Sequence, residues 1–334
     1  MLIAGIILQM SMKEYFLVKG ENMYVCQKKV AVLMATYNGE KYIKEQIDSL
    51  LCQTFEDYCI YIHDDGSDDN TLKIVREYEK NNTERIVIMQ GESTGEAKRN
   101  FLFMLKNVTA DIYMFCDQDD VWKTDKIEKA VKEINKTIGK KPVLVYTDLE
   151  YVDKNLNVIE KSYFSYQEKD ITKNSVKDVL IKNLFVGCTL AFNKQLRDVA
   201  INYKNIDYLQ MHDWWIGLLA CAMGNVIFIN EQTIKYRQHD NNVTGSKNQG
   251  RIIKILKRWI NIRNGIRIKR NYMKQRILFA KELFSVMHGD EKEYDFIREL
   301  SQLENKNKVT RIKFYLHNKM MEKNKSILWQ MLWI

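Results

Sequence analysis

The stretch Met114-Phe115-Cys116-Asp117-Gln118-Asp119-Asp120-Val121-Trp122 places three carboxylates within four residues, directly after an apolar run that begins at Ile112. Burying an unpaired carboxylate is costly, and clustered carboxylate oxygens are the hard ligands that suit Mg²⁺ or Mn²⁺. An acidic cluster at the end of a strand therefore predicts a divalent-cation site, and an ion held there can bind a diphosphate. The alternative is a solvated turn that caps the next helix.

Strand-like and helix-like segments alternate through the N-terminal half of the chain. Apolar, β-branched segments predict strands at residues 30–35, 58–62, 86–89 and 112–116. Helical spacing of apolar residues predicts helices at residues 43–51, 72–78 and 98–106. This alternation favours a parallel sheet with right-handed crossovers, in which ligands bind beyond the carboxyl ends of the strands. Polar groups follow three of these strands, and they are Thr36-Tyr37-Asn38, Asp64-Asp65 and Asp117–Asp120.

Motifs in the same order resemble the family-2 glycosyltransferases of GT-A fold. They are Ala35-Thr36-Tyr37-Asn38-Gly39, Gln53-Thr54-Phe55, Asp64–Thr71, Asp117–Trp122, Gly187-Cys188-Thr189, His212–Trp215 and Tyr236–His239. The most similar group within the family is the bacterial rhamnosyltransferase-like one. The resemblance implies an α/β, Rossmann-like fold with a mostly parallel central sheet and helices on both faces. We expect an N-terminal extension at 1–27, a catalytic domain at 28–245 and a basic helical region at 246–334.

The resemblance also implies a nucleotide site at the ends of the first strands. Thr36, Tyr37 and Asn38 would contact the base and ribose, with the Tyr37 ring offering a stacking face. Asp65 would accept the imide N–H of uracil or thymine, because an ionised carboxylate is only an acceptor. Arg99 would approach the phosphate or base. The alternatives are an ordinary strand end with a turn, and a surface arginine at a helix start.

The resemblance assigns the metal to the Asp-x-Asp-Asp segment. Asp119 is the expected direct ligand, Asp120 is the alternative, and Asp117 contacts ribose or a metal-bound water. His239 could reach the ion through a ring nitrogen. The expected cofactor is Mg²⁺ or Mn²⁺, which would neutralise the charge that develops on the departing nucleoside diphosphate.

By the same resemblance, Asp213 matches the base that deprotonates the acceptor hydroxyl. It precedes the apolar segment 216–223, so it is expected near a helix N-terminus, where the dipole favours the ionised carboxylate. The alternative is that Asp213 is only a helix cap. Further residues expected near the donor sugar or acceptor are Asp148 (at the end of an apolar strand), Gly187, Cys188, His212, Trp214, Trp215 and Arg237.

Positive charge is concentrated near the C-terminus. The chain has a formal net charge of +9, and residues 251–334 carry 20 Lys and Arg against 8 Asp and Glu. Residues 251–276 contain ten basic residues and no acid, with apolar residues at helical spacing between them. Such a basic amphipathic helix favours an anionic membrane surface. The alternative is a helix packed on the catalytic domain with its basic side chains in water.

The remaining features set limits on location and class. No segment reaches the roughly 20 apolar residues of a membrane span, and the six cysteines show no paired spacing. We therefore expect a cytoplasmic enzyme, peripheral at the inner face of the cell membrane. The Gln-x-x-Arg-Trp motif of polymerising relatives is missing after Arg237, which favours addition of one or few sugars.

The sequence thus predicts an inverting, metal-dependent glycosyltransferase of the hexosyltransferase type. It would use a UDP- or dTDP-sugar, with dTDP-rhamnose first by resemblance, and a hydroxyl of a growing cell-surface polysaccharide or lipid-linked glycan. One rival is a nucleotidyltransferase that makes the activated sugar, but the Gly-rich basic loop of that class is replaced by Thr36-Tyr37-Asn38. The other is a nucleic-acid binder using the basic tail, and it leaves the acidic cluster unexplained. We expect no nucleic-acid partner, and the sequence gives no oligomeric state.

Overall fold

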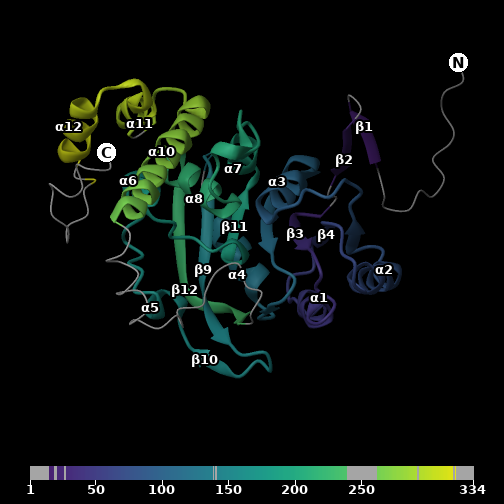
Figure 1. The fold of residues 1–334 in the computed structure, drawn as a ribbon. Helices are drawn as coiled ribbons and strands as arrows, with labels where there is room; N and C mark the ends of the chain where they lie inside the picture. The colour runs from purple at the N-terminus through teal and green to yellow at the C-terminus, as the bar shows by residue number, and fades with distance from the viewer. Residues whose placement is uncertain are drawn as a thin grey trace, which may run out of the picture.

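The fold is built on one central sheet flanked by helices, as the computed structural model shows (Figure 1). The structure describes residues 15–18, 21–25, 28–137, 139, 141–238, 262–291, 293–318 and 320. Four parallel strands form one half of the sheet, in the order β5 (Ile86–Ile88), β4 (Tyr58–Asp64), β3 (Val30–Thr36) and β7 (Ile112–Cys116). The carboxyl ends of these strands carry the polar segments singled out in the sequence.

The other half of the sheet is mixed. Strand β11 (Leu190–Asn193) lies antiparallel between β7 and β9 (Val143–Val152), and β12 (Asn225–Arg237) runs parallel to β9. Two short strands complete it, with β8 (Val121–Trp122) on β12 and β10 (Val158–Glu160) on β9. Strand β8 directly follows the acidic turn, so the turn is fixed by sheet strands at both of its ends.

Helices cover both faces, as expected. They are α1 (Ile43–Leu51), α2 (Thr71–Asn81), α3 (Ala97–Asn107), α4 (Lys126–Asn135), α5 (Tyr163–Tyr166), α6 (Val176–Ile181), α7 (Lys194–Ala200) and α8 (His212–Met223), with 3₁₀ turns η1 (Gly187–Thr189) and η2 (Ile206–Tyr208). Side chains of β3 alternate between the two faces of the sheet. Val30, Val32 and Met34 share one core with residues of α1, α2 and α4, whereas Ala31 and Leu33 share the other with residues of α3, α7 and α8.

The described parts of both terminal regions pack on this body. At the N-terminus, β1 (Tyr15–Val18) and β2 (Glu21–Val25) form a small sheet with β6 (Val108–Thr109). At the C-terminus, α10 (Ile262–Val286) is followed by α11 (Tyr294–Ser301), η3 (Leu303–Asn305) and α12 (Lys308–His317). Side chains of α10 belong to the same core as α8, with Phe279 lying against Trp214 and Trp215 at ring-centroid distances of 5.8 and 5.9 Å.

The basic amphipathic segment falls partly within α10. Met273 and Ile277 face the protein core, while Arg270 and Lys274 are exposed to solvent. The described part of this segment therefore packs as a helix on the catalytic body, and residues 251–261, with Trp259, lie outside the described residues. Among the helices that the structure describes, none combines the length and apolar character needed to cross a membrane.

One strand boundary differs from the expectation in a way that matters for the site. We expected an apolar strand to end at Asp148, but β9 continues to Val152, which places Asp148 inside the strand. The reason is that the Asp148 carboxylate is satisfied locally. Its Oδ1 accepts hydrogen bonds from the backbone N–H groups of Leu149 (2.8 Å) and Tyr163 (3.1 Å), and its Oδ2 accepts one from Gln232 Nε2 (3.1 Å).

Candidate functional site

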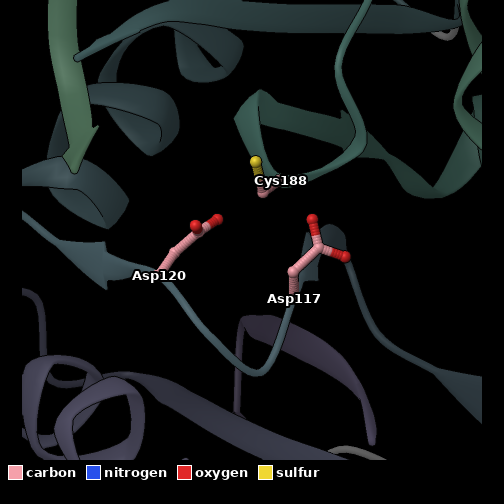
Figure 2. Close-up of side chains that lie close together, drawn as sticks. All are labelled: Asp117, Asp120 and Cys188. Carbon is pink, nitrogen blue, oxygen red and sulfur yellow. The ribbon is translucent and has the colours of Figure 1, made fainter. Parts of the chain in front are cut away.

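The acidic turn between β7 and β8 brings two carboxylates together with a thiol from η1. The ligand atoms of Asp117, Asp120 and Cys188 all lie within 4.8 Å of one another. Figure 2 shows the two aspartates on opposite sides of the turn with Cys188 above them. Asp120 and Cys188 are fully buried, whereas Asp117 is half-buried. The fold thus gathers oxygen and sulfur donors from segments about 70 residues apart along the chain.

This cluster carries more negative charge than the protein neutralises. Burial, together with the negative charges of Asp119 and Asp213, raises the pKa of Asp117 to about 7. Burial and the charges of Asp119 and Asp117 raise the pKa of Asp120 well above its usual range. Among the described residues, Asp120 Oδ2 is buried without a hydrogen-bond partner. Hard oxygen donors with an orphaned acceptor fit a divalent cation.

A buried lysine lies behind the cluster and was missed by the sequence reasoning. Lys126, the first residue of α4, is 1 % exposed, and its Nζ lies 4.6 Å from the centre of the Trp122 ring. Burial lowers its pKa to about 8, while the nearby Asp120 acts in the opposite direction. The only sequence signal was a lysine in the first turn after the acidic motif, which is indistinguishable from a surface lysine.

Asp119 differs from its neighbours because its side chain is half-exposed. It lies outside the three-residue donor group, yet it is near enough for its charge to raise the pKa of both Asp117 and Asp120. Its backbone carbonyl accepts a hydrogen bond of 2.9 Å from Arg237 Nε. The structure therefore places Asp119 toward solvent and Asp120 toward the interior, and the identity of the direct ligand stays a prediction.

Arg237, the last residue of β12, forms hydrogen bonds to the acidic turn. Its backbone N–H donates to Asp120 Oδ1 (3.1 Å), and its fully buried guanidinium contacts Asp119 O, Lys154 O and Glu45 Oε2. The guanidinium also lies 4.4 Å from the centre of the Tyr42 ring. We expected Arg237 near the donor sugar, but here its donors bind protein groups. His239, the other residue expected on this segment, lies outside the described residues.

The expected nucleotide segment lies beside the acidic turn. Thr36 ends β3 and donates a hydrogen bond of 2.8 Å from Oγ1 to Asp64 Oδ2. Tyr37 is 57 % exposed, so its ring is open for stacking. Asn38 adopts a left-handed conformation (φ 47°), and its side-chain oxygen accepts from Asp68 N–H at 3.0 Å. These contacts hold Thr36, Tyr37 and Asn38 as a rigid rim with an exposed aromatic face.

The two remaining nucleotide candidates are engaged within the protein. Asp65 is 9 % exposed, and its Oδ1 accepts hydrogen bonds from Thr94 N–H, from Gly95 N–H at 3.3 Å and from Ser93 Oγ at 3.3 Å. It therefore orders the loop that precedes α3. Arg99, half-exposed on α3, forms ion pairs with Glu96 (2.9 Å) and Asp207. The structure brings Asp65 to the same edge as Thr36, through a backbone hydrogen bond of 2.8 Å from Asp65 N–H to Thr36 O.

Asp213 lies in the first turn of α8, as expected. The residue is 9 % exposed; its Oδ1 accepts from Trp214 N–H (2.7 Å) and its Oδ2 accepts from Asn183 Nδ2 (3.2 Å). Burial raises its pKa to about 6, while these hydrogen bonds and the charge of Lys169 oppose the rise. The carboxylate is thus largely ionised at neutral pH and lies close enough to Asp117 to affect its pKa.

The residues around Asp213 form its supporting wall. His212 is buried between Phe101 (4.2 Å between ring centroids) and Phe115 (4.9 Å), and burial lowers its pKa to about 3, so the ring is neutral. Gly187 is required here because a Cβ would lie 2.9 Å from His212 Nε2. Trp214 donates from Nε1 to Val179 O, and fully buried Trp215 donates to Ala200 O. Trp215 therefore packs in the core beneath the first turn of α8, which carries Asp213.

Comparison with known proteins agrees with this geometry. Residues 31–194 match glycosyl transferase family 2. A dTDP-rhamnosyl transferase, RfbG of Shigella flexneri, is 32% identical over 226 residues, covering 64% of this chain and 74% of that protein. The putative teichuronic acid biosynthesis glycosyltransferase TuaG of Bacillus subtilis is 26% identical over 219 residues, and the match covers 65% of this chain and 82% of TuaG.

A solved structure shows the same fold. S. aureus TarS 1-349, in complex with UDP-GlcNAc, superposes with a TM-score of 0.52 at 16% identity, covering 86% of this chain and 78% of TarS. This likeness shows the architecture, a GT-A fold. The predicted fold class and enzyme class are therefore confirmed. The chain belongs to glycosyl transferase family 2 and is a glycosyltransferase of GT-A fold.

Proposed function

We propose that this protein is an inverting, metal-dependent glycosyltransferase that moves a sugar from a UDP- or dTDP-sugar to a glycan hydroxyl in the assembly of a cell-surface polysaccharide. The observation that carries the proposal is the convergence of Asp117, Asp120 and Asp213 on one edge of the sheet. An acidic pair with an acceptor oxygen that has no hydrogen-bond partner among the described residues, beside a separate ionisable carboxylate, suits a metal-bound diphosphate donor and a proton acceptor. The likeness to RfbG supports a dTDP-rhamnose donor, and that to TuaG supports a polysaccharide acceptor.

In this proposal, different residues bind the metal, bind the nucleotide and accept the proton. Asp117, Asp119 and Asp120 would hold Mg²⁺ or Mn²⁺, which when bound neutralises the diphosphate leaving group. Tyr37 would stack on the base, and Asp65 would face its imide edge. Asp213 would accept the proton of the acceptor hydroxyl at its carboxylate as the oxygen attacks the anomeric carbon from the opposite side of the departing diphosphate. Its pKa of about 6 suits this role, because the base must be ionised near neutral pH.

The acceptor and the location of the enzyme belong to the same proposal. We infer a lipid-linked glycan acceptor, with the enzyme peripheral at the inner face of the cell membrane through the basic residues of 251–276. The exposed Arg270 and Lys274 support electrostatic attraction to anionic lipid. Sedimentation with vesicles of phosphatidylglycerol, compared with phosphatidylcholine, tests this part. Equal binding to both vesicles would contradict it.

The central test is direct. A thermal-shift panel of UDP- and dTDP-sugars with and without Mn²⁺ should identify a donor that stabilises the protein only with the ion, with dTDP-rhamnose the expected one. Asp213→Asn should then retain binding of this donor and lose transfer, measured as release of nucleoside diphosphate. Wild-type turnover by Asp213→Asn would rule out Asp213 as the base, and release of pyrophosphate would indicate a nucleotidyltransferase.

A further inference from the structure

Two polar side chains outside the sequence motifs connect to the carboxylate of Asp213. Asn183, which follows α6, donates from Nδ2 to Asp213 Oδ2 at 3.2 Å. The other end of the same amide is fixed, because Asn183 Oδ1 accepts from the Phe185 N–H at 3.0 Å. The amide therefore has one orientation, and its N–H₂ group points at the carboxylate.

Lys169 binds the main chain of the segment that carries Asn183. Its Nζ donates to Asn183 O at 3.0 Å and to Leu184 O at 3.3 Å, and it lies 4.6 Å from the centre of the Tyr163 ring. The lysine is partly buried between these groups, and its positive charge favours the ionised form of Asp213. Both residues thus act on the same carboxylate, Asn183 by a direct hydrogen bond and Lys169 by charge and by holding the Asn183 main chain.

We propose that Asn183 and Lys169 are positioning residues that orient the Asp213 carboxylate and favour its ionised form for proton transfer. This inference rests on the proposed function, because it assumes that Asp213 is the base. Neither residue needs to touch substrate. Their geometry explains how a carboxylate that is 9 % exposed remains available as a proton acceptor, since an unpaired buried carboxylate would be held in its neutral form.

The other ionisable groups around Asp213 act differently and must be considered in any pH measurement. Asp117, at the end of β7, is a like charge that opposes ionisation of Asp213. His212 is neutral, because burial lowers its pKa to about 3. Burial raises the pKa of Tyr163 beyond the working range, so this residue is also neutral. Lys169 is therefore the one cation that the structure describes as acting on Asp213, and Asn183 the one side-chain hydrogen-bond donor.

The experiment compares pH profiles of kcat/KM for wild type, Lys169→Met, Lys169→Arg and Asn183→Ala, using the donor identified in the panel. Loss of either interaction should raise the pKa of the base, so the acid limb should move to higher pH by about one unit, since one unit corresponds to about 1.4 kcal/mol, the scale of a hydrogen bond to a charged group. Lys169→Arg should restore the wild-type profile because it keeps the cation. Lys173→Met removes an exposed lysine of the same segment and should leave the profile unchanged.

A second measurement separates positioning from misfolding. Binding of UDP with Mn²⁺, followed by calorimetry, should be within twofold of wild type in all these variants, because the donor site lies on other elements. Unshifted acid limbs in both Lys169→Met and Asn183→Ala would overturn the inference, as would equal loss of UDP binding and activity. Failure of the proposed function would look different, because Asp213→Asn itself would then retain turnover.

Discussion

Gln118 pairs with the main chain of Tyr37 through both ends of its side-chain amide. Its Oε1 accepts from Tyr37 N–H at 2.9 Å, and its Nε2 donates to Tyr37 O at 2.8 Å. This is the pattern of a β-bridge made by one side chain. The fit is close, because a Cβ on Gly39 would lie 2.2 Å from Gln118 Oε1. The acidic turn and the exposed Tyr37 ring are therefore held as one unit.

This pairing predicts that Gln118→Ala weakens nucleotide binding without unfolding the protein. Two hydrogen bonds of about 1 kcal/mol each hold the rim, so we expect roughly tenfold to thirtyfold weaker binding of UDP in the presence of Mn²⁺. Calorimetric titration measures the affinity, and the melting temperature measures the fold. Gln275→Ala, which removes an exposed glutamine from α10, is the matched control and should bind like wild type. Unchanged affinity in Gln118→Ala would show that the two segments act independently.

A second prediction concerns the half-exposed member of the acidic turn. Asp119→Ala should remove the Mn²⁺ dependence of UDP binding, because its carboxylate is the one directed toward solvent, where a diphosphate can approach. The readout is the ratio of UDP affinities with and without Mn²⁺. Asp57→Ala is a suitable control, since Asp57 is an exposed carboxylate at the opposite edge of the sheet, just before β4. A wild-type ratio in Asp119→Ala would shift the ligand assignment to Asp117 and Asp120.

The sequence predicted the parallel half of the sheet and most of its polar edge, because those features are local. The predicted strand at 112–116 agrees with β7, and the helix expected at 98–106 lies within α3 (Ala97–Asn107). The spacing of apolar residues and the residues that form turns can both be recognised within a short stretch of sequence. The motifs also led us to expect Asp213 near a helix N-terminus, and it lies in the first turn of α8.

What the sequence could not show are contacts between distant segments. Lys126 resembles any lysine in the first turn of a helix, and only the fold reveals that it is buried behind Asp120. Arg237 was expected near the donor sugar or acceptor, yet its guanidinium contacts Glu45, which lies 192 residues away in the chain. Asp148 looked like a strand end because a carboxylate inside a strand is unusual, until the N–H groups at the start of α5 are seen to satisfy it.

The surplus negative charge of the turn gives a prediction about stability. The folded-state pKa of Asp117 is about 7, above its ordinary value of 3.8, so the folded protein retains this proton more strongly than the unfolded chain. Its contribution to stability is therefore present at low pH and is lost as pH rises through about 7. Without metal, Asp117→Asn should raise the melting temperature at pH 8 by at least roughly 2 °C and leave it unchanged at pH 4.

Added Mn²⁺ provides the internal control for this variant. The ion should stabilise wild type more than Asp117→Asn, because it binds the ionised carboxylate and counteracts its repulsion. At pH 8 and millimolar Mn²⁺, the difference in melting temperature between Asp117→Asn and wild type should therefore become smaller or change sign. A wild type that is the more stable of the two at pH 8 without metal would show that the carboxylate is already neutralised within the protein.

The contact between Phe279 of α10 and the tryptophans of α8 predicts that the C-terminal helix folds with the catalytic body. Phe279 is 1% exposed, and truncation of a buried phenylalanine typically costs about 3–5 kcal/mol. Phe279→Ala should lower the urea midpoint while tryptophan fluorescence and far-ultraviolet circular dichroism still report one shared transition. Tyr272→Ala, at a position that is 59% exposed on the same helix, should leave the midpoint unchanged. Two separate transitions in wild type would instead mean that α10 unfolds independently of the catalytic body, despite the contacts of Phe279 with Trp214 and Trp215.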